Sequence, residues 1–161
     1  MRTYHARKMD KDPIYPYQAW KITEEEFLLE NNHHNEAIFT LGNGYMGLRG
    51  TLEEDYPGSE DTTTPGFYIN GVYASEEIIY GEEAPNLPQD GQTIINLADW
   101  SEINLYINEE KLNLVKGQIL EYKRELDLEQ GVLNRRLVWE DRQGRKIEIK
   151  ITRLISLSRE H

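Results

Sequence analysis

The sequence contains no cysteine, which excludes disulfide bonds and thiolate chemistry and fits a reducing compartment. It also lacks any run of about 20 apolar residues, the length that a membrane-spanning helix requires. The basic residues within positions 1–8 are not followed by an apolar stretch, so no secretory signal is visible. These absences predict a soluble cytoplasmic protein with no membrane partner.

Positive charge is scarce over most of the chain. Residues 22–110 contain 19 acidic residues and one basic residue, whereas residues 111–161 contain 8 acidic and 12 basic residues. The net charge of −11 argues against nucleic acid as a partner, because an acidic surface repels phosphate backbones. We expect the two segments to face and neutralise each other in one fold; the alternative is a sign-selective binding surface.

Most sequence motifs of catalysis are missing as well. The chain has no G-x-S-x-G elbow, no P-loop lysine motif and no cysteine nucleophile, so acyl and phosphoryl transfer lack their usual groups. The adjacent His33 and His34 would point in different directions on a strand or a helix, and no second histidine cluster exists. Paired carboxylates for glycoside hydrolysis carry no signal among 29 acidic residues. We therefore predict no metal and no cofactor.

Glycine is concentrated in one block, LGNGYMGLRG at residues 41–50. The block has the spacing G-x-G-x-x-G, formed by Gly42, Gly44 and Gly47. A dinucleotide site needs a strand before these glycines and a helix after them, and further glycines make the following run a poor helix. We predict instead a hairpin that joins strand-like residues 36–41 and 45–52.

Arg49 is the single basic residue of the acidic segment and lies beside Gly50 at the end of this block. Its guanidinium has two possible roles: to hold an anionic ligand, or to form a structural bridge between carboxylates. Glu36, Glu53 and Glu54 are the candidate carboxylates. We favour the buried structural bridge, because a lone cation in an acidic segment has many internal partners.

The C-terminal third has the period-two pattern of strands with one buried face. One such row is formed by Leu120, Tyr122, Leu126 and Leu128, with Arg124 interrupting, and two more by Leu133, Leu137 and Trp139 and by Ile147, Ile149, Ile151, Ile155 and Leu157. Turn residues at 129–131 and 141–144 predict an antiparallel meander.

The rest of the chain has weaker signals. Residues 103–107 and 112–114 predict another hairpin, and residues 76–92, with two prolines, two glycines and four glutamates, predict a long surface loop. Helix is hard to find: the best candidate is residues 23–29, where Thr23 and Glu26 have the spacing of a capping box.

Exposed aromatic side chains are candidates for stacking on sugar rings. The chain offers Tyr15, Tyr17, Trp20, Tyr45, Tyr68, Tyr73, Trp100 and Trp139. Trp139 shares its parity with Leu133 and Leu137, so we assign it to the core. The candidate carbohydrate-binding residues are Tyr45, Tyr68, Tyr73 and Trp100.

Four blocks in the same order resemble the N-terminal region of glycoside hydrolase family 65. They are residues 36–50, 66–73, 95–100 and 122–133. The resemblance implies an all-β antiparallel sandwich of the galactose-mutarotase-like type with little helix, in which Gly42, Gly44, Gly47, Arg49 and Gly50 are structural. The family consists mainly of inverting phosphorylases of α-glucosides such as maltose, trehalose and kojibiose, which release β-glucose 1-phosphate.

The resemblance also implies what this chain does not contain. In the family, an (α/α)6 barrel that follows the sandwich holds the general acid and the phosphate-binding residues, and no such helical sequence is present here. No catalytic residue is therefore assigned, and residues 1–161 are expected to be a truncated N-terminal sandwich domain whose partner is that barrel.

Two functions remain open at this point. The first is a non-catalytic sandwich domain that supports the barrel of a phosphorylase; the alternative is a stand-alone carbohydrate-binding module. An incomplete sandwich would expose the apolar row of residues 147–155 and unpaired strand edges, so we also expect a homodimer.

Overall fold

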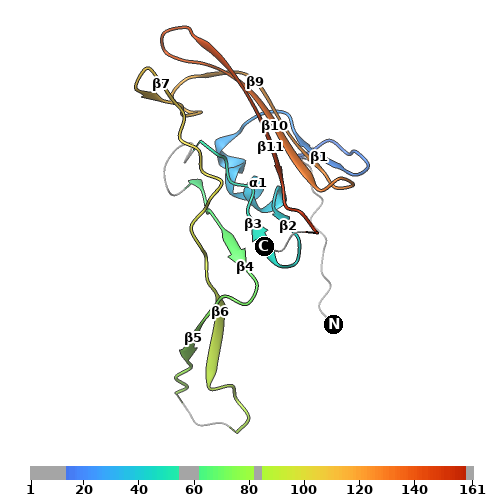
Figure 1. The fold of residues 1–161 in the computed structure, drawn as a ribbon, viewed down its shortest axis with the longest axis vertical. Helices are drawn as coiled ribbons and strands as arrows, with labels where there is room; N and C mark the ends of the chain where they lie inside the picture. The colour runs from blue at the N-terminus through green and yellow to red at the C-terminus, as the bar shows by residue number, and fades with distance from the viewer. Residues whose placement is uncertain (1–13, 55–61, 82–84, 159–161) are drawn as a thin grey trace, which may run out of the picture.

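The computed structural model describes residues 14–54, 62–81 and 85–158 (Figure 1). In chain order its elements are β1 (Lys21–Glu24), the 3-10 helix η1 (Leu29–Asn31), α1 (Asn32–Ile38), β2 (Leu41–Gly42), β3 (Met46–Leu48), β4 (Phe67–Ile69), β5 (Tyr73–Glu77), β6 (Asp90–Ile94), β7 (Tyr106–Ile107), β8 (Glu110–Lys111), β9 (Gln118–Asp127), β10 (Val132–Glu140) and β11 (Lys146–Leu154). All named strand pairs are antiparallel, and α1 is the single α-helix of the described residues. The predicted all-β class is confirmed.

The main sheet has four strands in the order β1-β9-β10-β11. Leu137 of β10 stands opposite Tyr122 of β9 on one side and Ile149 of β11 on the other. The chain reverses between these strands at Gly131 and Gly144, whose φ angles are +66° and +80°, a conformation that glycine adopts without steric cost. The predicted meander is confirmed.

The core lies on the inner face of this sheet, in two clusters of buried residues. The first contains Leu52, Leu112, Leu114, Leu137 and Trp139; the second contains Phe39, Leu41, Leu126 and Leu133. Trp139 is 1% exposed, which confirms its assignment to the core. Ile147 and Ile149 pack against the first cluster and Ile155 against the second, so the expectation that this row faces water is wrong: loops and short strands from earlier in the chain cover it.

The helix prediction is wrong in its position. Lys21–Glu24 is strand β1, paired with β9, and the α-helix begins at Asn32. The residues of α1 that are buried are Asn32, Asn35 and Glu36. Their spacing of three and four residues is helical, but they are polar, so a search for apolar periodicity passes over them. Residues 36–38, predicted as strand, are therefore helical.

The glycine block forms the predicted hairpin. Leu41 of β2 pairs with Leu48 of β3, and Gly44 in the connecting turn has a φ of +85°. The second predicted hairpin is present but tighter than expected: β7 and β8 are joined by Asn108 and Glu109, both with positive φ, as a two-residue turn requires.

The predicted loop at 76–92 is confirmed for the described residues 78–81 and 85–89 and is wrong at its two ends, where Glu76 and Glu77 belong to β5 and residues 90–92 belong to β6. β5 and β6 form a ladder from Tyr73 and Ile94 to Glu77 and Asp90. This hairpin extends away from the rest of the chain, at the lower end of Figure 1. The inner pairs of the ladder involve small and polar residues and one glycine, so the sequence has no apolar alternation that would indicate the two strands. Residues 82–84 lie outside the described part.

Within the described residues, no helix has the length and hydrophobicity needed to span a bilayer.

Candidate functional site

Three arginines of the main sheet point into the interior beneath it. Arg124 lies on β9, Arg135 on β10 and Arg153 on β11, and their exposed fractions are 2%, 4% and 6%. Each occupies an inward position of its strand, in line with core leucines or isoleucines. A cation at such a depth needs ionic or carbonyl partners, because desolvation of an unpaired charge is very unfavourable.

Arg135 and Arg153 hold the segment that follows the glycine block. Arg135 Nη1 donates to Glu54 Oε1 at 2.7 Å, and its Nη2 contacts both Glu54 and, at 3.1 Å, Glu53 Oε2. Arg153 Nη2 binds the Glu53 carboxylate and donates to the carbonyl of Thr51 at 3.0 Å. Two carboxylates from one segment are thus matched by two arginines from adjacent strands.

Arg124 binds the backbone at Gly50. Its guanidinium stacks over the ring of Phe39 with 4.5 Å to the centroid, contacts Glu24 Oε2 at 3.9 Å and donates to the carbonyl of Gly50. A Cβ atom at Gly50 would lie 2.7 Å from Phe39 and 2.8 Å from Arg124. A side chain at this position would therefore push the helix end away from the sheet.

Glu36 joins α1 to two other segments and is fully buried. One carboxylate oxygen accepts from Asn32 Nδ2 at 3.0 Å and from the hydroxyl of Thr63, and the other accepts from the backbone N–H of Thr64 at 2.7 Å. The carbonyl of Glu36 accepts from Gly50 N–H at 2.8 Å. One glutamate thus fixes the helix, the glycine block and the segment before β4.

Arg49 lies beside this cluster, with its Nη2 atom 3.8 Å from Glu36 Oε2 and 25% of its side chain exposed. Of the three carboxylates considered for it, Glu36 is therefore its neighbour, while Glu53 and Glu54 are bound by Arg135 and Arg153. The backbone of Arg49 donates to the carbonyl of Gly66 at 2.8 Å, which connects the glycine block to the segment that leads into β4.

These pairs show where the acidic and the basic segments of the sequence meet. Cations from β9, β10 and β11 meet acids from residues 24–54 across sequence separations of up to 100 residues. The prediction that the acidic and basic segments face each other in one fold is confirmed for the buried pairs of Arg124, Arg135 and Arg153, while most exposed cations of residues 111–161 pair with acids of the same segment.

Burial and charge shift the pKa values of this cluster in ways that the contacts explain. Burial raises the pKa of the Glu24 carboxyl, although Arg124 and the hydrogen bonds from Tyr122 and Asn35 oppose it. Burial also lowers the pKa of Arg124 and raises that of Tyr122. For Arg135, burial alone would lower the pKa, but Glu54 and Glu53 outweigh it and raise the pKa.

Glu24 makes stability dependent on pH. Because its folded pKa is raised, the native state favours the protonated form, and this contribution is present at low pH and is lost as pH rises through the folded pKa. The unfolding free energy of the wild type minus that of Glu24→Gln should therefore fall as pH rises from about 4 towards neutrality.

Urea denaturation at a series of pH values measures this difference. Glu25→Gln, at the exposed neighbouring position, is the control and should show no such trend. A difference for Glu24→Gln that stays constant or grows with pH would contradict the expectation.

The candidate aromatic residues are only partly brought together. Tyr45 and Tyr68 line a shallow hollow of about 400 Å³, together with Gly44, Gly47 and Asn70. Tyr73 donates from its hydroxyl to Asn70 Oδ1 at 2.9 Å, at the border of this hollow.

Trp100 packs edge to face on Phe67, with ring centroids 6.1 Å apart. Phe67 and Tyr68 are consecutive in β4 and so point to opposite faces of that strand. Trp100 therefore packs with the residue of the other face and does not line the hollow of Tyr45 and Tyr68.

The glycines of the block have separate geometrical roles. Asn43 closes the turn beside Gly44: its Oδ1 accepts from the backbone of Tyr45 at 3.0 Å and of Met46 at 2.8 Å. Gly42 has the carbonyl of Met46 within 3.2 Å of where a Cβ would stand, and Gly47 lies in β3 opposite Tyr68. The glycine block thus forms a strand-turn-strand unit, without the helix that a dinucleotide site needs.

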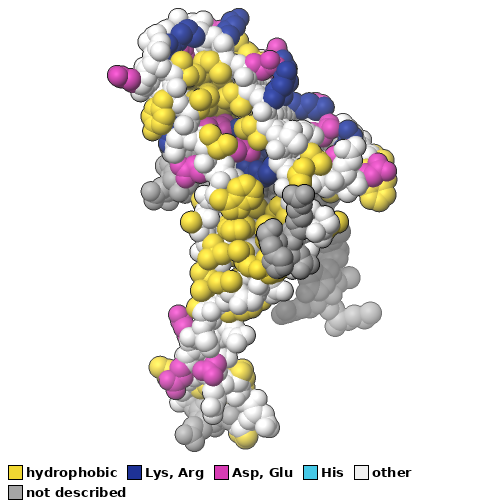
Figure 2. All heavy atoms as spheres, in the orientation of Figure 1, with side chains coloured by type: hydrophobic (Ala, Val, Ile, Leu, Met, Phe, Trp, Pro, Cys, Tyr) yellow, Lys and Arg dark blue, Asp and Glu magenta, His cyan; other side chains and the backbone are white. Residues whose placement is uncertain are grey.

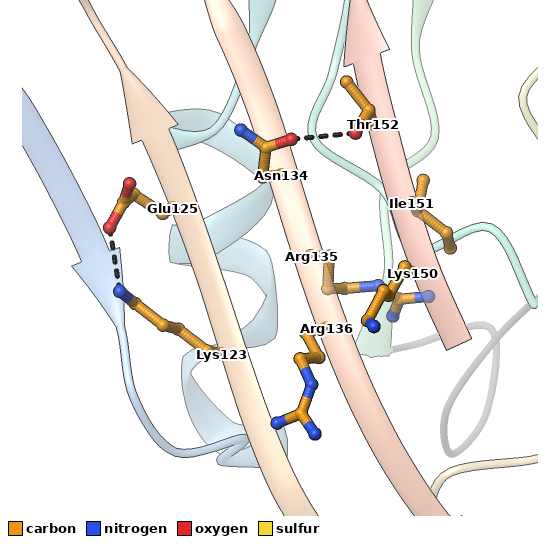
Figure 3. A pocket seen from close by; sticks show the side chains of 8 residues that line it. All are labelled: Lys123, Glu125, Asn134, Arg135, Arg136, Lys150, Ile151 and Thr152. Carbon is orange, nitrogen blue, oxygen red and sulfur yellow. Dashed lines mark hydrogen bonds and ion pairs between the residues drawn. The ribbon is translucent and has the colours of Figure 1, made fainter. Parts of the chain in front are cut away.

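The outer face of the main sheet carries a row of cations formed by Lys123, Arg136 and Lys150 (Figure 3). They line a hollow of about 270 Å³. Each has an acidic partner: Lys123 contacts Glu125 at 2.9 Å, and Arg136 and Lys150 both contact Glu148, at 2.7 and 3.2 Å. This face is a balanced, solvated charge ladder rather than a free cationic site.

The two adjacent histidines have separate surroundings. His33 Nδ1 lies 3.1 Å from the hydroxyl of Thr64, and His34 stacks on Tyr15. Among the described residues, no three potential metal ligands of the His, Cys, Asp or Glu type converge.

The fold and its buried charge network define an all-β domain in which buried arginines bind carboxylates of the same chain. Residues 22–161 match the family described as glycosyl hydrolase family 65, N-terminal domain. The chain belongs to this family and corresponds to its N-terminal domain.

Relatives with named activities are much longer than this chain. An alpha,alpha-trehalose phosphorylase of Thermoanaerobacter brockii is 45% identical over 94% of this chain and 20% of its own length. A kojibiose phosphorylase of the same organism is 37% identical over 98% of this chain and 18% of its own length. A solved structure described as "Putative kojibiose phosphorylase from human microbiome" superposes with a TM-score of 0.75 at 31% identity, covering 86% of this chain and 18% of that one. The chain thus spans about a fifth of the length of the relatives that it matches.

Sequence reasoning did not predict that the three arginines of the inner face bind the buried carboxylates. The signal was present: Arg124 interrupts an apolar row, Arg135 lies between Leu133 and Leu137 in the same parity, and Arg153 follows Ile151. A cation at an inward strand position indicates a buried ion pair when the same chain has unmatched acids elsewhere.

Proposed function

We propose that this chain is a non-catalytic N-terminal domain of an α-glucoside phosphorylase, located in the cytoplasm, that supports a catalytic barrel. The observation that carries the proposal is the occupation of the buried carboxylates. Glu24, Glu36, Glu53 and Glu54 are all engaged by arginine, asparagine, tyrosine or backbone donors of the same chain. Carboxylates tied in this way maintain the fold and are poorly placed to protonate a glycosidic oxygen.

The relatives also support a non-catalytic role for this domain. They are phosphorylases of trehalose and of kojibiose, and this chain matches about a fifth of the length of each. Most of the sequence of such an enzyme therefore lies outside the segment that matches this chain. Relatives that act on different disaccharides all match this domain. In this proposal, the disaccharide is therefore selected by the part of the enzyme that lies outside the domain.

The direct test is an activity assay on the purified chain. With inorganic phosphate and trehalose, kojibiose or maltose, we expect no glucose 1-phosphate, while the trehalose phosphorylase of Thermoanaerobacter brockii serves as the positive control on trehalose. Release of glucose 1-phosphate by the chain would contradict the proposal. Titration calorimetry with the same sugars separates it from a stand-alone carbohydrate-binding module, for which heat of binding is required.

A homodimer is the further part of this proposal. β11 is an edge of the described main sheet and is nine residues long, and a free edge is a template for pairing with a second copy. We expect sedimentation equilibrium at micromolar concentration to show a small oligomer, with growth limited by the net charge of −11. A monomer of 18.9 kDa at all concentrations would rule this out.

A further inference from the structure

Two asparagine–glycine pairs occur in the sequence, Asn43-Gly44 and Asn70-Gly71. In such a pair the backbone nitrogen of the glycine can attack the side-chain amide of the asparagine, because glycine has no Cβ to obstruct the approach. The two pairs have the same local chemistry but different surroundings in the fold. A difference in their reactivity therefore has to come from the tertiary structure.

The side chain of Asn43 is held by three hydrogen bonds. Its Oδ1 accepts from the backbone N–H of Tyr45 at 3.0 Å and of Met46 at 2.8 Å, and its Nδ2 donates to the carbonyl of Ser156 at 2.9 Å. The last bond joins the glycine block to the segment after β11, 113 residues away in the sequence. Rotation of the Asn43 amide towards the nitrogen of Gly44 breaks these bonds, which opposes the reaction.

Asn70 lies in the turn between β4 and β5, and both Asn70 and Gly71 are exposed. The N–H of Val72 donates to the carbonyl of Ile69 at 3.2 Å and closes this turn. Gly71 has a φ of +90°, with no atom within 4 Å of where a Cβ would stand. The Asn70 side chain makes one hydrogen bond among the contacts of the described residues, from the exposed hydroxyl of Tyr73 at 2.9 Å. Its amide is therefore much less restrained than that of Asn43.

We propose that Asn70 is a site of spontaneous deamidation in the folded protein and that the fold protects Asn43. The backbone nitrogen of Gly71 attacks Cγ of Asn70, so that an N–Cγ bond forms and the Cγ–Nδ2 bond breaks. Ammonia leaves with the proton from the Gly71 N–H, and a five-membered cyclic imide remains. Water then opens the imide: addition at Cγ gives aspartate, and addition at the main-chain carbonyl gives isoaspartate. The net reaction consumes one water and releases one ammonia, without oxidation or reduction.

The products change both the charge and the main chain of this turn. Residues 50–110 contain no lysine, arginine or histidine, and Figure 2 shows acidic but no basic side chains on the visible face of the β5–β6 hairpin. A new carboxylate at position 70 thus has no cation from this part of the sequence to neutralise it. Isoaspartate also lengthens the main chain where Asn70 N–H donates to the carbonyl of Tyr45 at 2.7 Å. Deamidation therefore alters the connection between the glycine block and the hairpin that follows.

Peptide mapping by mass spectrometry tests this inference on the purified chain. Trypsin cleavage after Arg49 and Lys111 places Asn43 and Asn70 in separate peptides, residues 22–49 and 50–111. The chain is incubated at mildly alkaline pH, where deprotonation of the glycine N–H is easier, both in native buffer and in concentrated urea. Fragment spectra locate each exchange of an amide for a carboxylate. The matched variant is Asn70→Gln, whose longer side chain cannot form the five-membered ring.

In native buffer we expect Asn70 to deamidate at least about tenfold faster than Asn43, since the Asn43 side chain has two more hydrogen bonds to break. In urea the ratio of the two rates should fall towards one, because both sites are then unfolded asparagine–glycine pairs. Asn70→Gln should remove the signal at position 70 and leave that of Asn43 unchanged. Equal rates in native buffer, or faster reaction at Asn43, would overturn the inference. So would a native Asn70 that stays intact while the urea sample is converted.

Discussion

Replacement of Arg135 by alanine is expected to lower the free energy of unfolding by about 3–5 kcal/mol, the range for breaking a buried ion pair by removing one partner. The side chain is 4% exposed and binds both Glu53 and Glu54, so its loss leaves carboxylates buried without their counter-charge. Arg153 still reaches Glu53, but Glu54 has no comparable second partner among the described contacts. Urea denaturation followed by circular dichroism measures the change.

Arg136 is the matched control, because it is the next residue of the same strand and also forms two ion pairs. Its side chain is 46% exposed, and it contacts Glu121 and Glu148 on the solvent face. Arg136→Ala should therefore change the free energy of unfolding by less than about 1 kcal/mol. Equal losses for the two variants would show that the buried network does not control the stability of the fold.

Replacement of Glu36 by alanine has the second large expected effect, a loss of at least about 3 kcal/mol, since each buried donor left without an acceptor costs about 1–3 kcal/mol. The donors are Asn32, the Thr63 hydroxyl and the backbone of Thr64, which belong to two segments of the chain. Thermal or urea unfolding measures the loss.

A conservative variant and a surface variant sharpen this test. Glu36→Gln should recover part of the stability, because its amide oxygen can still accept one or two of the bonds while its NH₂ group meets a donor. Glu30→Ala, at an exposed position in η1, should stay within about 0.5 kcal/mol of the wild type. If Glu36→Ala behaved like Glu30→Ala, the carboxylate would not be the junction that its contacts describe.

The long strands of the main sheet were predictable from sequence because they have the pattern that burial of one face requires. Leu133, Leu137 and Trp139 share one parity of the strand, and Gly131 and Gly144 mark the turns, so local chemistry and tertiary packing agree. The hairpin of the glycine block was predictable for the same reason: Gly44 supplies the positive φ that the turn needs.

The helix and the β5–β6 hairpin were not predictable by the same means. The buried face of α1 is made of Asn32, Asn35 and Glu36, which a hydrophobic periodicity counts as exposed. Their burial is favourable because Thr63, Glu24 and Tyr15 provide hydrogen-bond partners from other parts of the chain. Strand β5 likewise has no apolar alternation, and its pairing with β6 is a matter of backbone hydrogen bonds.

By itself, the sequence determined the all-β class, the meander and the facing of an acidic segment by a basic one, because these follow from composition and period-two alternation. The tertiary structure alone decided which charges meet. Arg124, Arg135 and Arg153 find their partners at sequence separations of 74 to 104 residues. At such separations no local pattern specifies a partner; the register of β9, β10 and β11 places the guanidinium groups, and burial makes every unmatched pairing unfavourable.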